Sequence, residues 1–121
     1  RIGAASALKM CSAAYTKGAV ALGVEMMMAA HKLGVAEVLD AEMQDSIPDV
    51  RKWILSRTTA MPPKAYRWVP EMLEIAKTFE GSGLTPRMLE GAAEMFSSIA
   101  ATPLGGESPE QARAKGRSGA E

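Results

Sequence analysis

Lys9 is the residue of this sequence best placed for acid–base chemistry. It ends the segment GAASALK, residues 3–9, just inside the start of a long and otherwise apolar stretch with helical character. A lysine serves as a base only where burial or nearby positive potential disfavours its charged form, and the positive end of a helix dipole would lie within a turn of Lys9. Residues 10–14 provide no carboxylate to hold the charge. The position indicates either a catalytic base or, alternatively, a surface lysine in a first helical turn.

Ser12 and Thr16 are the nearest hydroxyl side chains beyond Lys9. They follow it by three and seven residues, which places them near its face of a helix. Each hydroxyl could therefore supply a polar contact to a substrate beside the lysine. The alternative is that each one bonds back to the helix carbonyl four residues earlier, as hydroxyl side chains inside helices often do.

A second candidate cluster is the segment KAYRW, residues 64–68, which follows two consecutive prolines. It interleaves two cations with two aromatic rings, and a guanidinium held against a ring can grip a carboxylate or phosphate with two hydrogen bonds. Lys64, Tyr66 and Arg67 are therefore candidate substrate-binding residues. The alternative is that the two aromatic rings belong to the core and the two cations are solvated.

The sequence predicts no metal site. Cys11 is the only cysteine and His31 the only histidine, and on one helix their separation of twenty residues corresponds to about 30 Å. His31 precedes Gly34 in a last helical turn, where an imidazolium stabilises the negative end of the dipole.

A single cysteine excludes an internal disulfide and is compatible with the reducing cytoplasm, and we expect Cys11 to pack in the core. We expect the nine methionines to fill irregular contacts between helices and between subunits rather than to line a recognition groove.

The elements that would position these residues are all helical, since no stretch alternates apolar and polar residues as a strand would. Proline, glycine and capping residues divide the chain into helices at about 6–33, 35–44, 49–57, 65–79 and 86–101. Thr85 is the expected N-cap of the last helix, with Pro86 at its first position. Residues 18–30 are apolar or tiny on nearly every face, so the first helix should be central and surrounded by protein.

Composition narrows the classes of partner. The chain has 14 basic and 14 acidic residues, so nothing in its charge favours nucleic acid or an anionic membrane. The stretch 18–30 is 13 residues long and contains Glu25, which is too short for a bilayer span of about 20 residues. Residues 1–101 are expected to form one helical domain, and residues 102–121, rich in glycine, proline and charge, an extended or disordered tail.

Four stretches in the same order resemble one known family. The sequences GAASALKM…TKG, KAYRWVPEMLEIAKTF, EGAAEMF and ATPLGGESPE, within residues 3–110, are similar to the C-terminal helical domain of the β-hydroxyacid dehydrogenase superfamily. Within it they resemble the NAD-binding phosphogluconate-dehydrogenase-like oxidoreductases. The resemblance implies an all-α fold in which shorter helices, about four of them, pack on a long central helix.

The resemblance also implies roles for individual residues. In these dehydrogenases an alcohol carbon gives hydride to nicotinamide while a lysine takes or relays the hydroxyl proton, and Lys9 is the matching position. That family commonly has a substrate-orienting asparagine one turn later, where this chain has Ala13. The later helix of the family carries substrate or cofactor contacts, which implies such a role for residues around 64–67. The familiar lysine–aspartate pair of that helix is not clearly matched by Glu71 and Met72.

The leading hypothesis is a substrate-binding and dimerisation domain of an NAD(P)-dependent oxidoreductase that acts on a small hydroxy acid. The sequence lacks the Gly-x-Gly-x-x-Gly fingerprint of a dinucleotide site, so NAD or NADP should be bound mainly by a Rossmann domain absent from this sequence, and this chain alone should be inactive. The alternative is a non-catalytic helical dimerisation or adaptor domain. Both hypotheses include a homodimer, with residues 18–30 at or near its interface.

Overall fold

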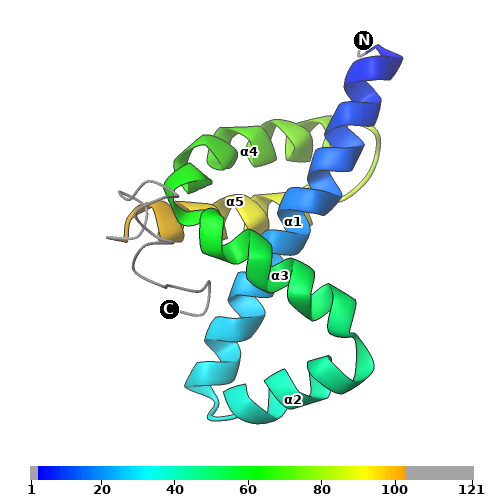
Figure 1. Ribbon diagram of the computed structural model, residues 1–121. Coiled ribbons are helices and arrows are strands. Elements are labelled where there is room, and N and C mark those ends of the chain that lie inside the picture. The colour runs from blue at the N-terminus through cyan, green and yellow to red at the C-terminus, as the bar shows by residue number, and fades with distance from the viewer. Residues whose placement is uncertain (1–2, 103–121) are drawn as a thin grey trace.

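The computed structural model describes residues 3–102, and every regular element in that range is a helix. In chain order these are α1 (Ala4–Lys32), α2 (Ala36–Ser46), α3 (Pro48–Ala60), the single 3-10 turn η1 (Pro62–Lys64), α4 (Ala65–Gly81) and α5 (Arg87–Ala100) (Figure 1). The predicted all-α fold, with four shorter α-helices packed on one long helix, is confirmed. All but the first residue of the predicted tail lies outside the described residues.

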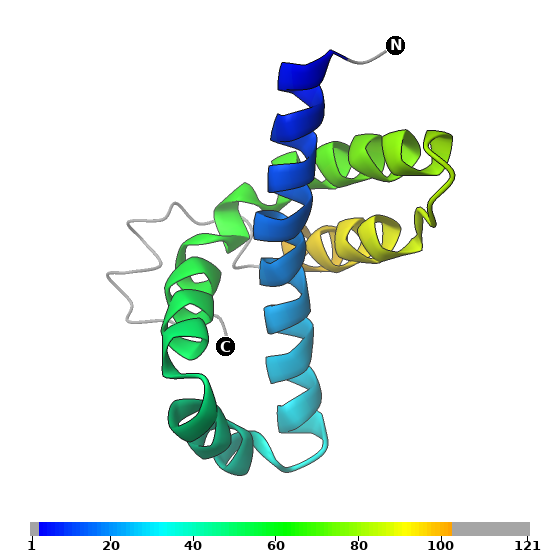
Figure 2. The same cartoon turned by 90° about the vertical axis from the view of Figure 1, so that its right-hand side faces the viewer.

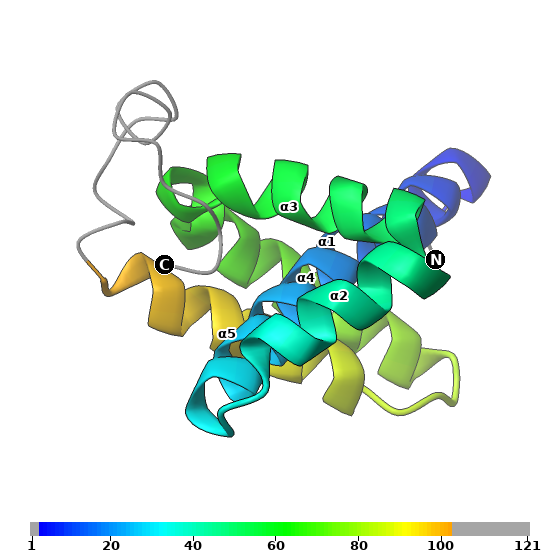
Figure 3. The same cartoon turned by 60° about the horizontal axis from the view of Figure 1, so that its bottom comes forward.

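Two helical hairpins, α2–α3 and α4–α5, pack against helix α1. Figure 2 shows α4 and α5 leaving it on one side, α2 and α3 lying along its C-terminal half on the other, and its N-terminal end projecting beyond both. Viewed from the α2 end, α2 and α3 cross over α1 (Figure 3). The candidate residues near Lys9 therefore lie on the half of α1 that only the α4–α5 hairpin approaches.

The core lies where α1, α4 and α5 meet. Phe96 of α5 is fully buried at its centre, and the Trp68 ring of α4 meets it edge to face, with the centroids 5.2 Å apart. Apolar residues spaced three or four apart supply the rest, because that spacing keeps them on one face of each helix. They include Val20, Val24, Met72, Ile75, Leu89 and Ile99.

Two glycines end helices in the left-handed conformation. Gly34 has φ 75°, and the Val35 N–H donates to the Ala30 carbonyl at 2.9 Å while the Gly34 N–H donates to His31. Gly83, with φ 87°, completes the same six-to-one hydrogen-bond pattern at the end of α4. This Schellman motif needs a residue with positive φ, so glycine fits both positions.

The predicted start of the last helix was one residue too early. Helix α5 begins at Arg87, with Pro86 and not Thr85 as its cap residue. The Thr85 hydroxyl still accepts a hydrogen bond from the Arg87 N–H at 3.2 Å, so it satisfies one free donor of the first turn. Helix α4 continues through Pro70 without a break in its assignment.

Helices α1 and α3 approach closely at Gly23. A Cβ atom placed on Gly23 would lie 2.9 Å from Cγ2 of Ile54, a separation that packed atoms do not tolerate. Gly23 is buried, and Ile54 fills the space that its missing side chain leaves. A glycine at this position thus sets how near α3 lies to the central helix.

One expectation about burial was wrong. Cys11 is exposed rather than packed in the core, because it shares the outward side of α1 with Leu8 and Tyr15. Leu22, in the second half of α1, is 69% exposed, so this chain leaves part of that half uncovered, as the expected homodimer interface there requires. Among the methionines, Met43, Met61 and Met72 are buried, and Met43 also lines a cavity together with Met26 and Met27.

Candidate functional site

A groove between α1 and α4 contains Lys9. Its volume is about 570 Å³, and each helix lines it with residues spaced three or four apart. From α1 come Ser6, Lys9, Met10 and Ala13, and from α4 come Glu71, Glu74, Ile75 and Thr78. The groove joins one amine, two carboxylates and two hydroxyls over an apolar base.

Lys9 lies at this groove with an exposed side chain. It is the sixth residue of α1. The helix dipole acts most strongly within the first turn, and Lys9 lies beyond that turn. Residues 10–14 carry no carboxylate, but Glu71 and Glu74 face the same groove from α4. Local sequence could not reveal them, because they lie more than sixty residues further along the chain.

Glu71 is held by Lys17 and not left free for Lys9. The Lys17 Nζ donates to both carboxylate oxygens of Glu71 at 2.7 Å, and the two side chains retain 26% and 37% of their exposure. The same Nζ lies 5.2 Å from the Trp68 ring centroid, within the range of a cation–π contact. This ion pair ties α1 to α4 at one end of the groove.

Glu74 and Thr78 are then the polar residues of α4 that remain for a ligand. In the described part of the chain Glu74 makes no ion pair, and the Thr78 hydroxyl donates to the Glu74 carbonyl at 3.0 Å. Lys9 is the one cation among the described residues that line the groove. The arrangement can hold a hydroxyl between an amine and a carboxylate, each able to exchange a proton with it.

Ser12 and Thr16 do not reach the groove. Both are exposed, and the Thr16 hydroxyl donates to the Ser12 carbonyl at 3.1 Å, which is the structural alternative for that residue. Ser6 takes the place that they were expected to fill. Its position three residues before Lys9 was the available signal, because spacing in either direction along a helix keeps residues on one face.

Lys64, Tyr66 and Arg67 also lie away from Lys9. Lys64 ends η1, and Tyr66 and Arg67 are exposed in the first turn of α4. None of the three lines the groove. Arg67 precedes Glu74 by seven residues, which is about 10 Å along the helix. The ion pair between Lys17 of α1 and Glu71 lies on the part of α4 between these two residues.

Among residues 3–102, no group of three or more histidine, cysteine, aspartate or glutamate side chains is placed to hold a metal ion. None of the helices described here contains a segment with the length and apolar character needed to cross a membrane.

Comparison with known sequences gives one match. A family model described as "Domain of unknown function (DUF1932)" matches residues 30–99. The match covers α2 to α5, including Glu71, Glu74 and Thr78, and begins after Lys9 and Ser6. No curated protein and no solved structure shows significant similarity to the chain.

Proposed function

The chain belongs to the DUF1932 family, and from this premise we propose that it is the substrate-binding domain of an NAD(P)-dependent oxidoreductase acting on a small hydroxy acid. One observation carries the proposal: Lys9 shares a groove with Glu74 and with the hydroxyls of Ser6 and Thr78. The all-helical fold and the resemblance of four stretches to dehydrogenase C-terminal domains support it.

The cofactor is not assigned to this chain. Residues 3–102 contain no strand, and so no glycine-rich turn from a strand into a helix of the kind that binds a dinucleotide pyrophosphate. The described residues therefore do not form a binding site for NAD or NADP by themselves. The proposal places it mainly in a nucleotide-binding domain that works together with this one.

Within the proposal, Lys9 exchanges the proton of the substrate hydroxyl. Ser6 and Thr78 would orient that hydroxyl from the two sides of the groove, and the small Ala13 side chain leaves room for the substrate carbon atoms. Lys9 is exposed in this chain, so a second domain would have to cover the groove and exclude water. A cytoplasmic location remains a prediction.

The substrate carboxylate has no partner in the groove other than Lys9. Ser12, Thr16, Lys64, Tyr66 and Arg67 remain predicted contacts, and the groove gives them no support because none of them lines it. The proposal therefore assigns the carboxylate contact to the second domain.

The experiment begins with the coding sequence upstream of Arg1. A domain of roughly 160 residues that opens with a strand and Gly-x-Gly-x-x-Gly is expected there. The longer protein is then titrated with NADH and NADPH by fluorescence and assayed with a panel of small hydroxy acids, with the 121-residue chain as the inactive control. A start codon beside Arg1, or a longer protein that binds neither NADH nor NADPH, would contradict the proposal.

A second candidate function, association through α1, rests on a separate observation. Leu8, Tyr15 and Leu22 follow one another at seven-residue intervals on α1, and their side chains are 73%, 77% and 69% exposed. Met88 of α5, 80% exposed, lines a shallow hollow beside Leu22. We call these four residues the apolar stripe. Apolar residues repeating every seven positions form the contact seam of paired helices.

We propose that the apolar stripe forms the interface of a homodimer, which is compatible with the catalytic proposal or sufficient by itself for a non-catalytic adaptor. The expected interface at residues 18–30 is thereby moved toward the N-terminus, because Ala21 and Gly23 are buried within the chain. Light scattering at micromolar concentration should give a dimer. Leu22→Glu should give a monomer, while Ser56→Glu, the same added charge on an exposed site of α3, should not. A monomeric parent chain would contradict this proposal.

A further inference from the structure

A second cavity lies at the opposite end of α1, between its last turns, α2 and α3. Its volume is about 400 Å³, within the range of small-molecule pockets. It exists because α2 packs loosely, with Met43 as the one buried residue among its eleven. Met26 precedes the end of α1 by six residues and follows Lys9 by seventeen, about 25 Å along the helix. This cavity is therefore separate from the groove described above.

The floor of the cavity is apolar and adaptable. Met26 and Met27 of α1, Leu39 and Met43 of α2, and Ile54 of α3 form it. Thioether side chains are unbranched and polarizable, so three of them adjust to the shape of an apolar group better than a branched surface does. The volume corresponds to roughly a dozen water-sized groups. The floor thus suits an apolar body of about that many heavy atoms or fewer.

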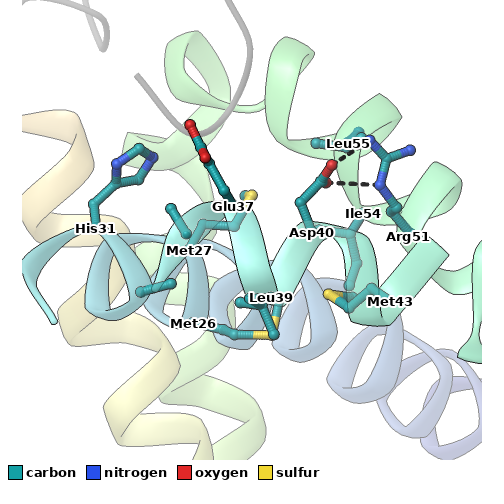
Figure 4. Close-up of a pocket in the computed structure, with 12 residues that line it drawn as sticks. Met26, Met27, His31, Glu37, Leu39, Asp40, Met43, Arg51, Ile54 and Leu55 are labelled. Carbon is teal, nitrogen blue, oxygen red and sulfur yellow. Dashed lines mark hydrogen bonds and ion pairs between the residues drawn. The ribbon is translucent and has the colours of Figure 1, made fainter. Parts of the chain in front are cut away.

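The mouth of the cavity carries more negative than positive charge. The Arg51 Nε and Nη2 donate to the two carboxylate oxygens of Asp40 at 2.7 and 3.1 Å, and these hydrogen bonds lower the pKa of Asp40 below its usual value. Glu37, one turn earlier on α2, makes no ion pair in the described part of the chain. Figure 4 shows both carboxylates rising above the methionine side chains, with His31 beside Glu37 at the edge.

We propose that this cavity binds a small organic cation, with its apolar body on the methionine floor and its ammonium group beside Glu37. Charge complementarity selects this ligand class. The charge of Arg51 is already paired with Asp40, so a ligand anion would meet the unpaired carboxylate of Glu37 without an unpaired cation to offset it among the described residues that line the cavity. A neutral apolar ligand would leave Glu37 without a partner. The site lies outside the oxidoreductase proposal and does not depend on it.

The test uses the 121-residue chain with ¹³C-labelled methionine methyl groups, whose NMR signals report on the cavity directly. Hexyltrimethylammonium is titrated in, with hexanoate and hexanol as anionic and neutral probes of the same length. The signals of Met26, Met27 and Met43 should shift saturably with the cation, while those of the distant Met88 and Met95 stay in place. The cation should bind at least about tenfold tighter than hexanoate. The absence of saturable shifts, or equal binding of the three probes, overturns the proposal.

A matched pair of variants locates the charge. Glu37→Gln removes the unpaired carboxylate from an exposed position and should weaken cation binding roughly three- to tenfold without changing hexanol binding. Glu42→Gln makes the same change on the same helix, outside the cavity, and should leave both unchanged. Equal cation binding by the Glu37→Gln variant and the parent chain would also overturn the proposal.

Discussion

Replacing Gly23 by alanine tests the close approach of α1 and α3. In a helix interior, alanine is more favourable than glycine by about 1 kcal/mol. At Gly23 the added Cβ would lie 2.9 Å from Cγ2 of Ile54 and 3.5 Å from its Cγ1, so Ile54 or α3 must move. Overpacking of this kind typically costs about 1–3 kcal/mol. We therefore expect Gly23→Ala to lower the free energy of unfolding by about 0–2 kcal/mol.

Two other helical glycines provide matched controls. A Cβ on Gly18 of α1 or on Gly91 of α5 would meet nothing within 4 Å. Gly18→Ala and Gly91→Ala should therefore each stabilise the chain by about 0.5–1 kcal/mol. The difference between the Gly23 and Gly18 variants gives the steric cost alone, about 1–3 kcal/mol, because both replacements gain the same helix propensity.

Urea unfolding followed by circular dichroism measures these differences. Ile54→Ala removes the three side-chain atoms that the new Cβ would meet. In that background Gly23→Ala should become stabilising, and the double-mutant cycle should show a coupling of about 1–3 kcal/mol. If Gly23→Ala stabilises the parent chain as much as Gly18→Ala does, the close approach described here is wrong.

Two further predictions concern the ion pairs. Lys17→Met leaves the half-buried Glu71 carboxylate without its partner and should cost about 1–2 kcal/mol in urea unfolding, whereas the exposed Lys77→Met should change little; equal effects would contradict the assigned pair. Arg51→Met should raise the carboxyl pKa of Asp40, measured by NMR, toward its usual value. Because the pKa of Asp40 is lowered in the folded chain, the ion pair stabilises the fold at pH values above the unfolded pKa, and this stabilisation is lost as the pH falls through the folded pKa. An unchanged titration of Asp40 in the Arg51→Met variant would contradict the assigned ion pair.

Some ends of the helices could be predicted because local chemistry determines them, while α2, α3 and α4 continue two or three residues beyond their expected ends. Gly34 ends α1 as expected, since the hydrogen bonds of its motif involve residues within a few positions of it. The proline at 48 begins α3 for the same kind of reason. These elements carry their own start and stop signals.

Side-chain burial along α1 could be predicted only in part. Where a helix is apolar on nearly every face, its periodicity does not show which face its neighbours cover. Cys11 was expected in the core and is exposed, and the sequence did not distinguish the exposed Leu22 from its buried neighbours. The two hairpins cover the face that carries Val20 and Val24, and that choice depends on the packing of α3, α4 and α5.

Of the residues that line the candidate groove, only Lys9 was predicted from the sequence as a site residue. Lys9 could be selected from its place near a helix start, but Glu74 and Thr78 come from a helix more than sixty residues away. Lys17 was missed although it follows Lys9 by eight residues on the same face, a spacing that points it toward the same neighbour. Lys64 and Arg67 were chosen for their chemistry, but Lys64 belongs to η1 and Arg67 to the first turn of α4, and neither lines the groove that contains Lys9.

The most direct test of the proposed function is the rate of hydride transfer in the longer protein that contains this chain. Single-turnover reduction of the nicotinamide by the substrate should be slower in Lys9→Met by roughly a hundredfold or more, because the substrate hydroxyl loses its proton acceptor. Cofactor affinity should not change. Lys77→Met, an exposed lysine of α4 outside the groove, should keep the parent rate. A near-normal rate in Lys9→Met would show that Lys9 is a surface residue and that the groove does not carry the chemistry proposed for it.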